Sequence, residues 1–209
     1  MKFSAVILAG GGSRRFNGDK GLALLGGKPL VSYVVDAVQP IVHEVLVVVS
    51  DGEQARAYEA ALGGGVEVIL DAYEGEGPLV GALTGLRAAN WEYTLLLPCD
   101  TPFLSRDVLR LLLEICIGVD AVVPRWPNGY IEPLQAAYHT ERAADAADEA
   151  LRGGRRDLRS MVSRLRRVRY ISTEVLKQLD QRLLTFTNIN SRAELARARS
   201  TLKKWKTPQ

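Results

Sequence analysis

Short apolar segments rich in β-branched residues alternate along the chain with segments of helical periodicity. Such alternation is typical of βαβ units and predicts a largely parallel sheet. Strands are expected at residues 3–8, 44–50, 66–70, 94–97, 121–123 and 168–171. Helices are expected at 29–38, 53–62, 77–90, 105–117 and 192–206, and two more helical patterns follow an apolar stretch at 134–139. The pattern predicts an α/β fold with a doubly wound, Rossmann-like, mostly parallel sheet.

We expect residues 1–209 to form a single domain. This length suits one α/β domain, and neither an internal repeat nor a low-complexity linker divides the chain. The rhythm changes after Pro124, where Trp126-Pro127-Asn128-Gly129 begins a looser stretch, but no separate unit is indicated.

The composition excludes several classes of protein. With 47% hydrophobic and 24% charged residues, the chain can bury a sizeable core. No apolar run approaches the roughly 18 residues that span a bilayer, and the first ten residues lack the features of a signal peptide. A net charge of +3 permits phosphate-bearing substrates but does not argue for a nucleic-acid partner. Cys99 and Cys116 fit neither a disulfide framework nor a metal motif, so we expect a cytoplasmic protein.

A glycine-rich segment directly follows the first expected strand, from Leu8 and Ala9 through Gly10 and Gly11 to Lys20. Glycine lets backbone N–H groups approach a phosphate closely, and basic side chains neutralise its charge. The spacing matches neither the dinucleotide-binding fingerprint nor the P-loop. A tight turn that carries solvated basic residues is the alternative interpretation.

This segment resembles the signature of the molybdenum cofactor guanylyltransferase family, which reads Leu-Ala-Gly-Gly, then Arg-Met-Gly-x-Asp-Lys, then Gly-x-Pro-Leu. Residues 8–11, 15–20 and 27–30 supply the three parts in that order. The chain departs from the signature at Phe16 and Asn17, and asparagine tolerates positive φ better than most residues. Later matches extend the resemblance over nearly the whole chain, at Asp71, 77–81, 98–102, 188–190 and 194–195.

The resemblance implies a soluble nucleotidyltransferase that moves GMP from GTP to molybdopterin, with or without molybdenum, and releases pyrophosphate. It implies Mg²⁺ as the cofactor, and it leaves room for transient contact with proteins of cofactor biosynthesis or with molybdoenzymes. In such transfers, catalysis is mostly positioning and charge neutralisation.

Two side chains are suited to the chemistry. Lys20, with Arg15 beside it in the motif, can neutralise charge that develops on the triphosphate oxygens. Asp100 ends an expected strand, where open α/β sheets place their ligands, and its hard carboxylate suits Mg²⁺. An aspartate that only caps the following turn is the alternative for Asp100.

We expect the nucleotide to be held by residues at the ends of the strands and in the glycine-rich segment: Leu8, Ala9, Gly10, Gly11, Lys20, Asp71 and Asp100. Asp71 is placed to contact ribose, base or metal, although a plain turn aspartate explains it nearly as well. Ser50 stands where relatives often carry an asparagine that contacts the base, so this contact is not expected here.

Two pairs of residues are candidates for binding the acceptor. Asn188 and Asn190 resemble a late asparagine pair of the family that serves the acceptor side. Arg155 and Arg156 follow Gly153-Gly154 within an arginine-rich segment, and arginine can grip a phosphate with two parallel hydrogen bonds. Turn asparagines and a solvated helix face are the competing interpretations.

Two other functions compete with guanylyl transfer. Another nucleotidyltransferase of this fold, such as a cytidylyltransferase, usually carries alanine where this chain has Gly10, and the missing Cβ leaves room for the larger guanine base. A non-catalytic nucleotide-binding adaptor is disfavoured because both Lys20 and Asp100 are present.

Overall fold

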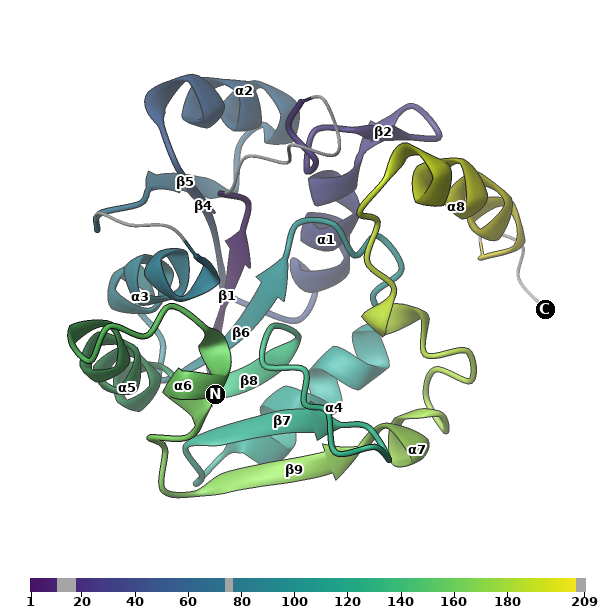
Figure 1. Ribbon diagram of the computed structural model, residues 1–209. Helices are drawn as coiled ribbons and strands as arrows, with labels where there is room; N and C mark the ends of the chain where they lie inside the picture. The colour runs from purple at the N-terminus through teal and green to yellow at the C-terminus, as the bar shows by residue number, and fades with distance from the viewer. Residues whose placement is uncertain (11–17, 74–76, 206–209) are drawn as a thin grey trace.

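The computed structural model describes residues 1–10, 18–73 and 77–205, and it shows a central sheet with helices on both faces (Figure 1). Within these residues the main sheet has seven strands in the order β5-β4-β1-β6-β8-β7-β9. Their bounds are β1 (Phe3–Leu8), β4 (Glu44–Val49), β5 (Glu67–Leu70), β6 (Tyr93–Pro98), β7 (Ala121–Arg125), β8 (Ala136–His139) and β9 (Val168–Ser172). The predicted α/β class and the predicted strands are confirmed.

One strand runs against the others. β1 is parallel to β4 and β6, β4 is parallel to β5, and β7 is parallel to β9, whereas β8 is antiparallel to both β6 and β7. The start of β8 therefore lies at the same edge of the sheet as the ends of β6 and β7. The residue before it, Gln135, is brought to the edge where ligands bind in sheets of this kind.

The helices agree with the predicted ones to within about two residues at most ends. They are α1 (Leu30–Val38), α2 (Gly52–Leu62), α3 (Pro78–Ala88), α4 (Arg106–Cys116), α5 (Thr140–Arg152), α6 (Leu158–Val162), α7 (Thr173–Leu176), the 3₁₀ helix η1 (Leu184–Phe186) and α8 (Arg192–Trp205). Sequence analysis missed α7 and η1. None of the helices in the described ranges is both long enough and apolar enough to cross a bilayer.

The sequence analysis also missed a small hairpin before α1. It consists of β2 (Leu24–Leu25) and β3 (Lys28–Pro29), with Gly26 and Gly27 as its two-residue turn. Both glycines have positive φ, 61° and 86°, which is the backbone that tight hairpin turns require. Pro29 belongs to β3, and α1 begins one residue after it, so the expected helix start at residue 29 was one residue early.

The core lies in two layers, one on each face of the sheet. Successive residues of β1 point to opposite faces, so Ala5 and Ile7 join one layer while Val6 and Leu8 join the other. The first layer is covered by α1, α2 and α4, and the second by α3, α5 and α6. Both faces of the central strands are buried, which explains why these strands appear in the sequence as continuous apolar runs.

A buried aspartate anchors the arginine-rich segment to the sheet. The Asp120 carboxylate, just before β7, accepts hydrogen bonds from the backbone N–H groups of Arg166 and Arg167 (3.0 Å each) and from the Arg142 guanidinium (2.6 Å). Desolvation alone would raise the pKa of Asp120. The backbone N–H of Arg167, the Arg142 guanidinium and the backbone N–H of Arg166 outweigh it and hold this pKa below its usual value.

Helix α3 packs unusually close to the sheet at Gly85. A Cβ at this position would fall well inside the van der Waals distance of Val6 Cγ1 and 3.0 Å from Val48 Cγ2. These two valines lie on neighbouring strands that end at the candidate site. The glycine therefore sets how closely α3, which begins beside the site, approaches β1 and β4.

We predict that Gly85→Ala lowers the free energy of unfolding by about 2 kcal/mol, because the cost of overpacking exceeds the gain of about 1 kcal/mol in helix propensity. Gly52→Ala in α2 is the matched control, since no atom lies within 4 Å of the Cβ built there. Urea unfolding of both variants and the unchanged protein measures the difference. Equal stability of Gly85→Ala and the unchanged protein would contradict this close packing.

Candidate active site

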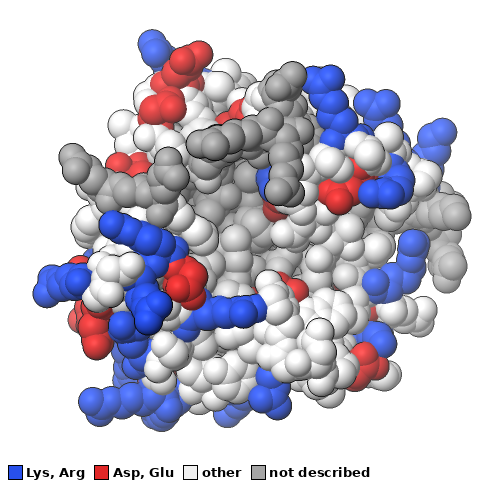
Figure 2. Space-filling view, viewed as in Figure 1, with Lys and Arg blue, Asp and Glu red and all other residues white. Residues whose placement is uncertain are grey.

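The candidate site lies where four parallel strands end. β1 is followed by Ala9 and Gly10, β4 by Ser50, β5 by Asp71, and β6 leads through Cys99 to Asp100. The backbone N–H groups of Ala9 and Gly10 both donate to the carbonyl of Val48, at 2.9 and 3.1 Å, so the start of the glycine-rich segment is an extension of the sheet. The molecule is hollowed at this place, near the centre of the face in Figure 2.

Three side chains from distant parts of the chain meet at the centre of the site. The Lys20 ammonium forms an ion pair with Asp100 Oδ2 and donates a hydrogen bond of 2.9 Å to Asn190 Oδ1. Asp100 is 2% exposed, so this is a buried carboxylate with one charged partner. The structure thus brings together the side chains that the sequence analysis assigned to catalysis and to the acceptor.

The second oxygen of the same carboxylate, Asp100 Oδ1, is buried and has no hydrogen-bond partner among the described residues. A buried acceptor left unpaired costs about 1–3 kcal/mol, unless a ligand, an ion or a water completes it. An oxygen of this kind is a suitable ligand for a hard cation. No group of three or more acidic, histidine or cysteine side chains could hold a metal within the described ranges. One carboxylate suffices for Mg²⁺, which keeps several waters and binds substrate phosphates.

Asp19, which the sequence analysis did not single out, joins the glycine-rich segment to α2. Its Oδ1 accepts hydrogen bonds from the backbone N–H of Gly21 (2.9 Å) and the Tyr58 hydroxyl (2.6 Å), and its Oδ2 accepts from the Gln54 amide. Gln54 also donates to the carbonyl of Ala9 (3.1 Å) and accepts from the backbone N–H of Ser50 (2.7 Å). Gln54 therefore connects the segment that carries Lys20 to the ends of β1 and β4.

Cys99, the residue before Asp100, is a core residue. Burial raises the pKa of its thiol to about 12, and the nearby Asp100 carboxylate raises it further than Lys20 lowers it. A thiol with this pKa is almost entirely protonated at neutral pH and is a poor nucleophile. Cys99 therefore serves as a small packing residue at the end of β6.

Asp71 is oriented by helix α3. The Thr84 hydroxyl donates to Asp71 Oδ1, and the backbone N–H of Tyr73 approaches the same oxygen at 3.4 Å. Gly81 leaves space beside the other oxygen, because a Cβ there would be 3.6 Å from Asp71 Oδ2. These contacts agree both with a ligand-binding carboxylate and with the turn aspartate of the alternative interpretation.

The C-terminal segment is joined to Asp100 by a hydrogen bond between the two backbones. The N–H of Ile189 donates to the carbonyl of Asp100 at 3.0 Å, so Asn188 and Asn190 flank a residue bound to the end of β6. Asn188 itself faces Gln135, whose amide donates to the carbonyl of Thr185 at 3.1 Å and approaches Asn188 Oδ1 at 3.4 Å.

Gln135 is a part of the site that sequence reasoning missed. It is 2% exposed and has a φ of 139°, in a region that side chains other than glycine rarely occupy. Such backbone strain is found mostly at functional sites. One signal in the sequence could have found this residue, since it is a lone amide in the apolar stretch 134–139.

Similarity to known proteins agrees with this geometry. A family model described as the MobA-like NTP transferase domain matches residues 5–168. The chain belongs to this family. It is therefore a nucleotidyltransferase, and its predicted resemblance to molybdenum cofactor guanylyltransferases is confirmed by the relatives described next.

This NTP transferase has relatives of nearly the same length. It is 34% identical over 202 residues to the molybdenum cofactor guanylyltransferase of Desulfosudis oleivorans, with 96% of each chain covered. The crystal structure of molybdopterin-guanine dinucleotide biosynthesis protein A from Archaeoglobus fulgidus is 30% identical, with a TM-score of 0.82 over 96% of this chain and 99% of that chain. The 2-C-methyl-D-erythritol 4-phosphate cytidylyltransferase of Thermus thermophilus, at 21% identity, 97% and 100% coverage and a TM-score of 0.70, shares the fold.

The nucleotide-binding residues predicted for the NTP transferase fall partly inside the described ranges. Gly11 and Arg15 lie outside them. The Leu8 and Ala9 side chains are buried in the core, so only their backbone can reach a ligand. A Cβ on Gly10 would lie 2.7 Å from Ser50 Oγ, so the space left by the absent side chain borders the Ser50 hydroxyl.

The arginines of residues 152–169 divide into two groups. In the first group, the guanidinium groups are engaged by other residues. The contacts are ion pairs of Arg152 with Asp148 and of Arg167 with Asp120, hydrogen bonds of Arg164 to the Ser160 carbonyl and of Arg169 to the Ile115 carbonyl, and the stacking of Arg159 on Tyr130. Figure 2 shows lysines and arginines gathered over α5 and α6.

Arg155 and Arg156 belong to the second group. Their guanidinium groups form neither an ion pair nor a hydrogen bond with the described residues. The backbone of Arg156 lies against the start of α3, since a Cβ on Gly77 would be 2.9 Å from the Arg156 carbonyl oxygen. The structure thus places these two arginines beside the N-terminus of α3, on the opposite side of the site from α8 (Figure 1).

We predict that Lys20→Met lowers the free energy of unfolding by about 3 kcal/mol, because it leaves the buried Asp100 carboxylate without its charged partner. The double variant Lys20→Met/Asp100→Asn should regain most of this loss, since no uncompensated charge is then buried. Urea unfolding of the two variants, Asp100→Asn and the unchanged protein completes the cycle. Additive losses in the double variant would show that the pair contributes no coupling energy.

Proposed function

We propose that this NTP transferase moves the GMP group of GTP to the phosphate of molybdopterin or of the molybdenum cofactor, and releases pyrophosphate. One observation carries the proposal: a lysine, a buried carboxylate with one open oxygen and an asparagine meet at the strand ends of a chain whose relatives of nearly equal length are named molybdenum cofactor guanylyltransferases.

The reaction forms one bond to phosphorus and breaks another. An oxygen of the acceptor phosphate attacks the α-phosphorus of GTP, and the bond between this phosphorus and the oxygen that bridges to the β-phosphate breaks. The bonding electrons leave with pyrophosphate. Because negative charge grows on the leaving oxygens, a cation placed beside them lowers the barrier.

We assign that neutralising role to Lys20, with Arg15 as a second cation of the same segment. Asp100 would hold Mg²⁺ through its open oxygen Oδ1, while Oδ2 keeps the Lys20 ammonium in place. When bound, the ion would supply further positive charge to the triphosphate. The Asp19 network with Gln54 and Tyr58 then fixes the position from which the Lys20 side chain projects.

The nucleotide would lie along the ends of β1, β4 and β5. The backbone of Leu8, Ala9, Gly10 and Gly11 is proposed to line one side of the nucleotide, with Asp71 beyond it on the ribose, the base or the metal. The Ser50 hydroxyl lies directly against Gly10, where a Cβ would come within 2.7 Å of it, so Gly10 lets the ends of β1 and β4 approach each other closely at this place.

The acceptor would approach from the other side of Asp100. Asn190 is held next to Lys20, and Asn188 next to Gln135, so both amides lie along the C-terminal segment that borders the centre. Arg155 and Arg156 lie across the site from this segment, beside the start of α3, and form no ion pair or hydrogen bond through their side chains with described residues. They remain our proposal for the acceptor phosphate.

Three further assignments belong to this proposal. Residues 1–209 act as one domain, the protein works in the cytoplasm, and it makes transient contact with proteins of cofactor biosynthesis or with molybdoenzymes. Cytidylyl transfer on the same fold and a non-catalytic adaptor are the competing functions, and the experiments below separate them.

We expect GTP with Mg²⁺ to stabilise the protein more than CTP, ATP or UTP does, because the chain carries Gly10 where cytidylyltransferases of this fold usually carry alanine and its full-length relatives are named guanylyltransferases. At about 100 times the dissociation constant, a bound nucleotide adds roughly 2.7 kcal/mol to the free energy of unfolding. Thermal unfolding with each nucleotide at equal concentration measures the order. Stronger stabilisation by CTP would replace guanylyl by cytidylyl transfer.

We expect Asp100→Asn to remove Mg²⁺-dependent pyrophosphate release while the variant stays folded, since the amide keeps the shape of the carboxylate but not its charge. Turnover should fall by 10²-fold or more, which corresponds to about 3 kcal/mol. Asp145→Asn, in an exposed ion pair with Arg87, is the control and should retain full activity. A normal metal requirement in Asp100→Asn would move the metal to Asp71, and no pyrophosphate release by the unchanged protein would favour the adaptor.

A further inference from the structure

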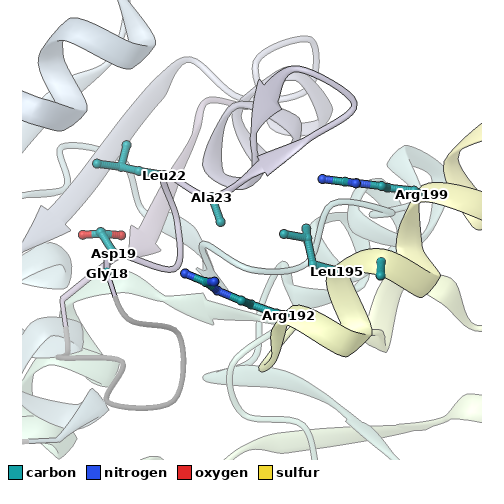
Figure 3. Close-up of a pocket in the computed structure, with 8 residues that line it drawn as sticks. Gly18, Asp19, Leu22, Ala23, Arg192, Leu195 and Arg199 are labelled. Carbon is teal, nitrogen blue, oxygen red and sulfur yellow. The ribbon is translucent and has the colours of Figure 1, made fainter.

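A cavity of about 420 Å³ lies between the glycine-rich segment and the first turns of α8. Leu22 and Ala23 line one side, and Arg192, Leu195 and Arg199 line the other. Figure 3 shows Arg192 extending from α8 toward Gly18 and Asp19, and Arg199 extending toward the hairpin that follows Ala23. We call this cavity the α8 pocket. Its volume is in the range of cavities that bind small molecules.

The two arginines of the α8 pocket have no partners in the described part of the chain. Neither guanidinium group forms an ion pair or a hydrogen bond there. They are seven residues apart, which is close to two full turns, so both side chains leave the same face of the helix. A ligand in the pocket can therefore be reached by both side chains.

The one acidic side chain that lines the pocket has other partners. Both oxygens of Asp19 are already engaged, Oδ1 by the N–H of Gly21 and the Tyr58 hydroxyl, and Oδ2 by Gln54. Among its described residues the α8 pocket therefore offers two arginines, an apolar wall and one carboxylate, whose two oxygens are already held by three hydrogen bonds.

The pocket is lined by neighbours in the chain of the residues that meet at the centre of the site. Asp19 precedes Lys20 in the chain, and Arg192 comes two residues after Asn190, whose side chain Lys20 contacts at 2.9 Å. The Ile189 N–H on the Asp100 carbonyl holds this part of the chain in place, and Glu194 in the first turn of α8 accepts from the Asn190 N–H. A substrate bound at Lys20 and Asp100 can thus extend into the pocket.

We propose that Arg192 and Arg199 bind a phosphate group of one of the two substrates in the α8 pocket. The inference rests on the proposed function, in which both substrates carry phosphate. Arginine suits the task because its planar group grips phosphate oxygens with parallel hydrogen bonds and stays charged at any physiological pH. Two sources share this chemistry: the β,γ end of the triphosphate, which leaves as pyrophosphate, and the phosphate monoester of the acceptor.

Binding of two simple probes, inorganic pyrophosphate and inorganic phosphate, tests the pocket without any turnover. Titration calorimetry on the full chain should show that Arg192→Ala/Arg199→Ala weakens at least one probe by 10-fold or more. The charge-conserving variant Arg192→Lys/Arg199→Lys should lose less. Arg197→Ala is the matched control, because Arg197 lies on α8 but does not line the pocket, and it should bind both probes normally.

The probe that is weakened identifies the source. Loss of pyrophosphate binding assigns the pocket to the triphosphate end, and loss of phosphate binding alone assigns it to the acceptor. Unchanged binding of both probes in the double alanine variant, an equal loss in Arg197→Ala, or no binding of either probe to the unchanged protein overturns the proposal. If probe binding depends on the two arginines but the protein transfers no GMP, the pocket stands and the proposed function falls.

Discussion

The site depends on one buried carboxylate. Asp100 stands at the end of β6, and three parts of the chain meet on it: Lys20 through an ion pair, the C-terminal segment through the Ile189 N–H on its carbonyl, and the sheet through the strand itself. Since a charged partner offsets much of the cost of burying a carboxylate, Asp100 holds Lys20 at the strand ends, where we propose that it neutralises the triphosphate. The same interaction that permits this burial positions the proposed catalytic group.

The strands of the sheet could be predicted because the central ones are buried on both faces, so Val45 to Val49 forms an unbroken apolar run. β8 was not predicted as a strand because Ala136 to His139 is short and shows no clear alternation of apolar and polar residues. Its antiparallel direction depends on its pairing with β6 and β7, which the sequence does not show. The hairpin at Gly26-Gly27 was not predicted because Pro29 suggested the start of a helix. A Gly-Gly pair between apolar residues is nevertheless a recognised signal for a hairpin turn.

In the candidate site, too, some residues could be predicted from the sequence and others could not. Lys20, Asp100 and Asn190 could be predicted because each belongs to a motif at a strand end or beside one, and strand ends of a parallel sheet share an edge. Gln54 and Tyr58 could not, since their bonds to Asp19 join residues 35 and 39 positions apart. Gln135 is marked in the sequence only as a lone amide in an apolar stretch, and its place at the site depends on the antiparallel direction of β8. Motifs locate the groups that do chemistry, whereas the residues that hold them are found only once the chain is folded.

The charged residues of this protein indicate a phosphate-binding site only once it is known which of them form ion pairs or hydrogen bonds within the fold. The net charge of +3 says little about where a phosphate binds, and the most arginine-rich segment, residues 152–169, uses most of its guanidinium groups to join helices, strands and loops. An arginine that already binds a carboxylate or a carbonyl has fewer free N–H donors and a partly neutralised charge. It therefore contributes little to the binding of a further anion. Arginines that have no partner among the described residues, such as Arg192 and Arg199, keep their donors and their charge available for an anion. They lie on the side of the site that Lys20 and Asn190 already connect to the catalytic carboxylate. The local deficit of negative charge, more than the density of arginine along the sequence, marks where this transferase can hold the phosphates of its substrates.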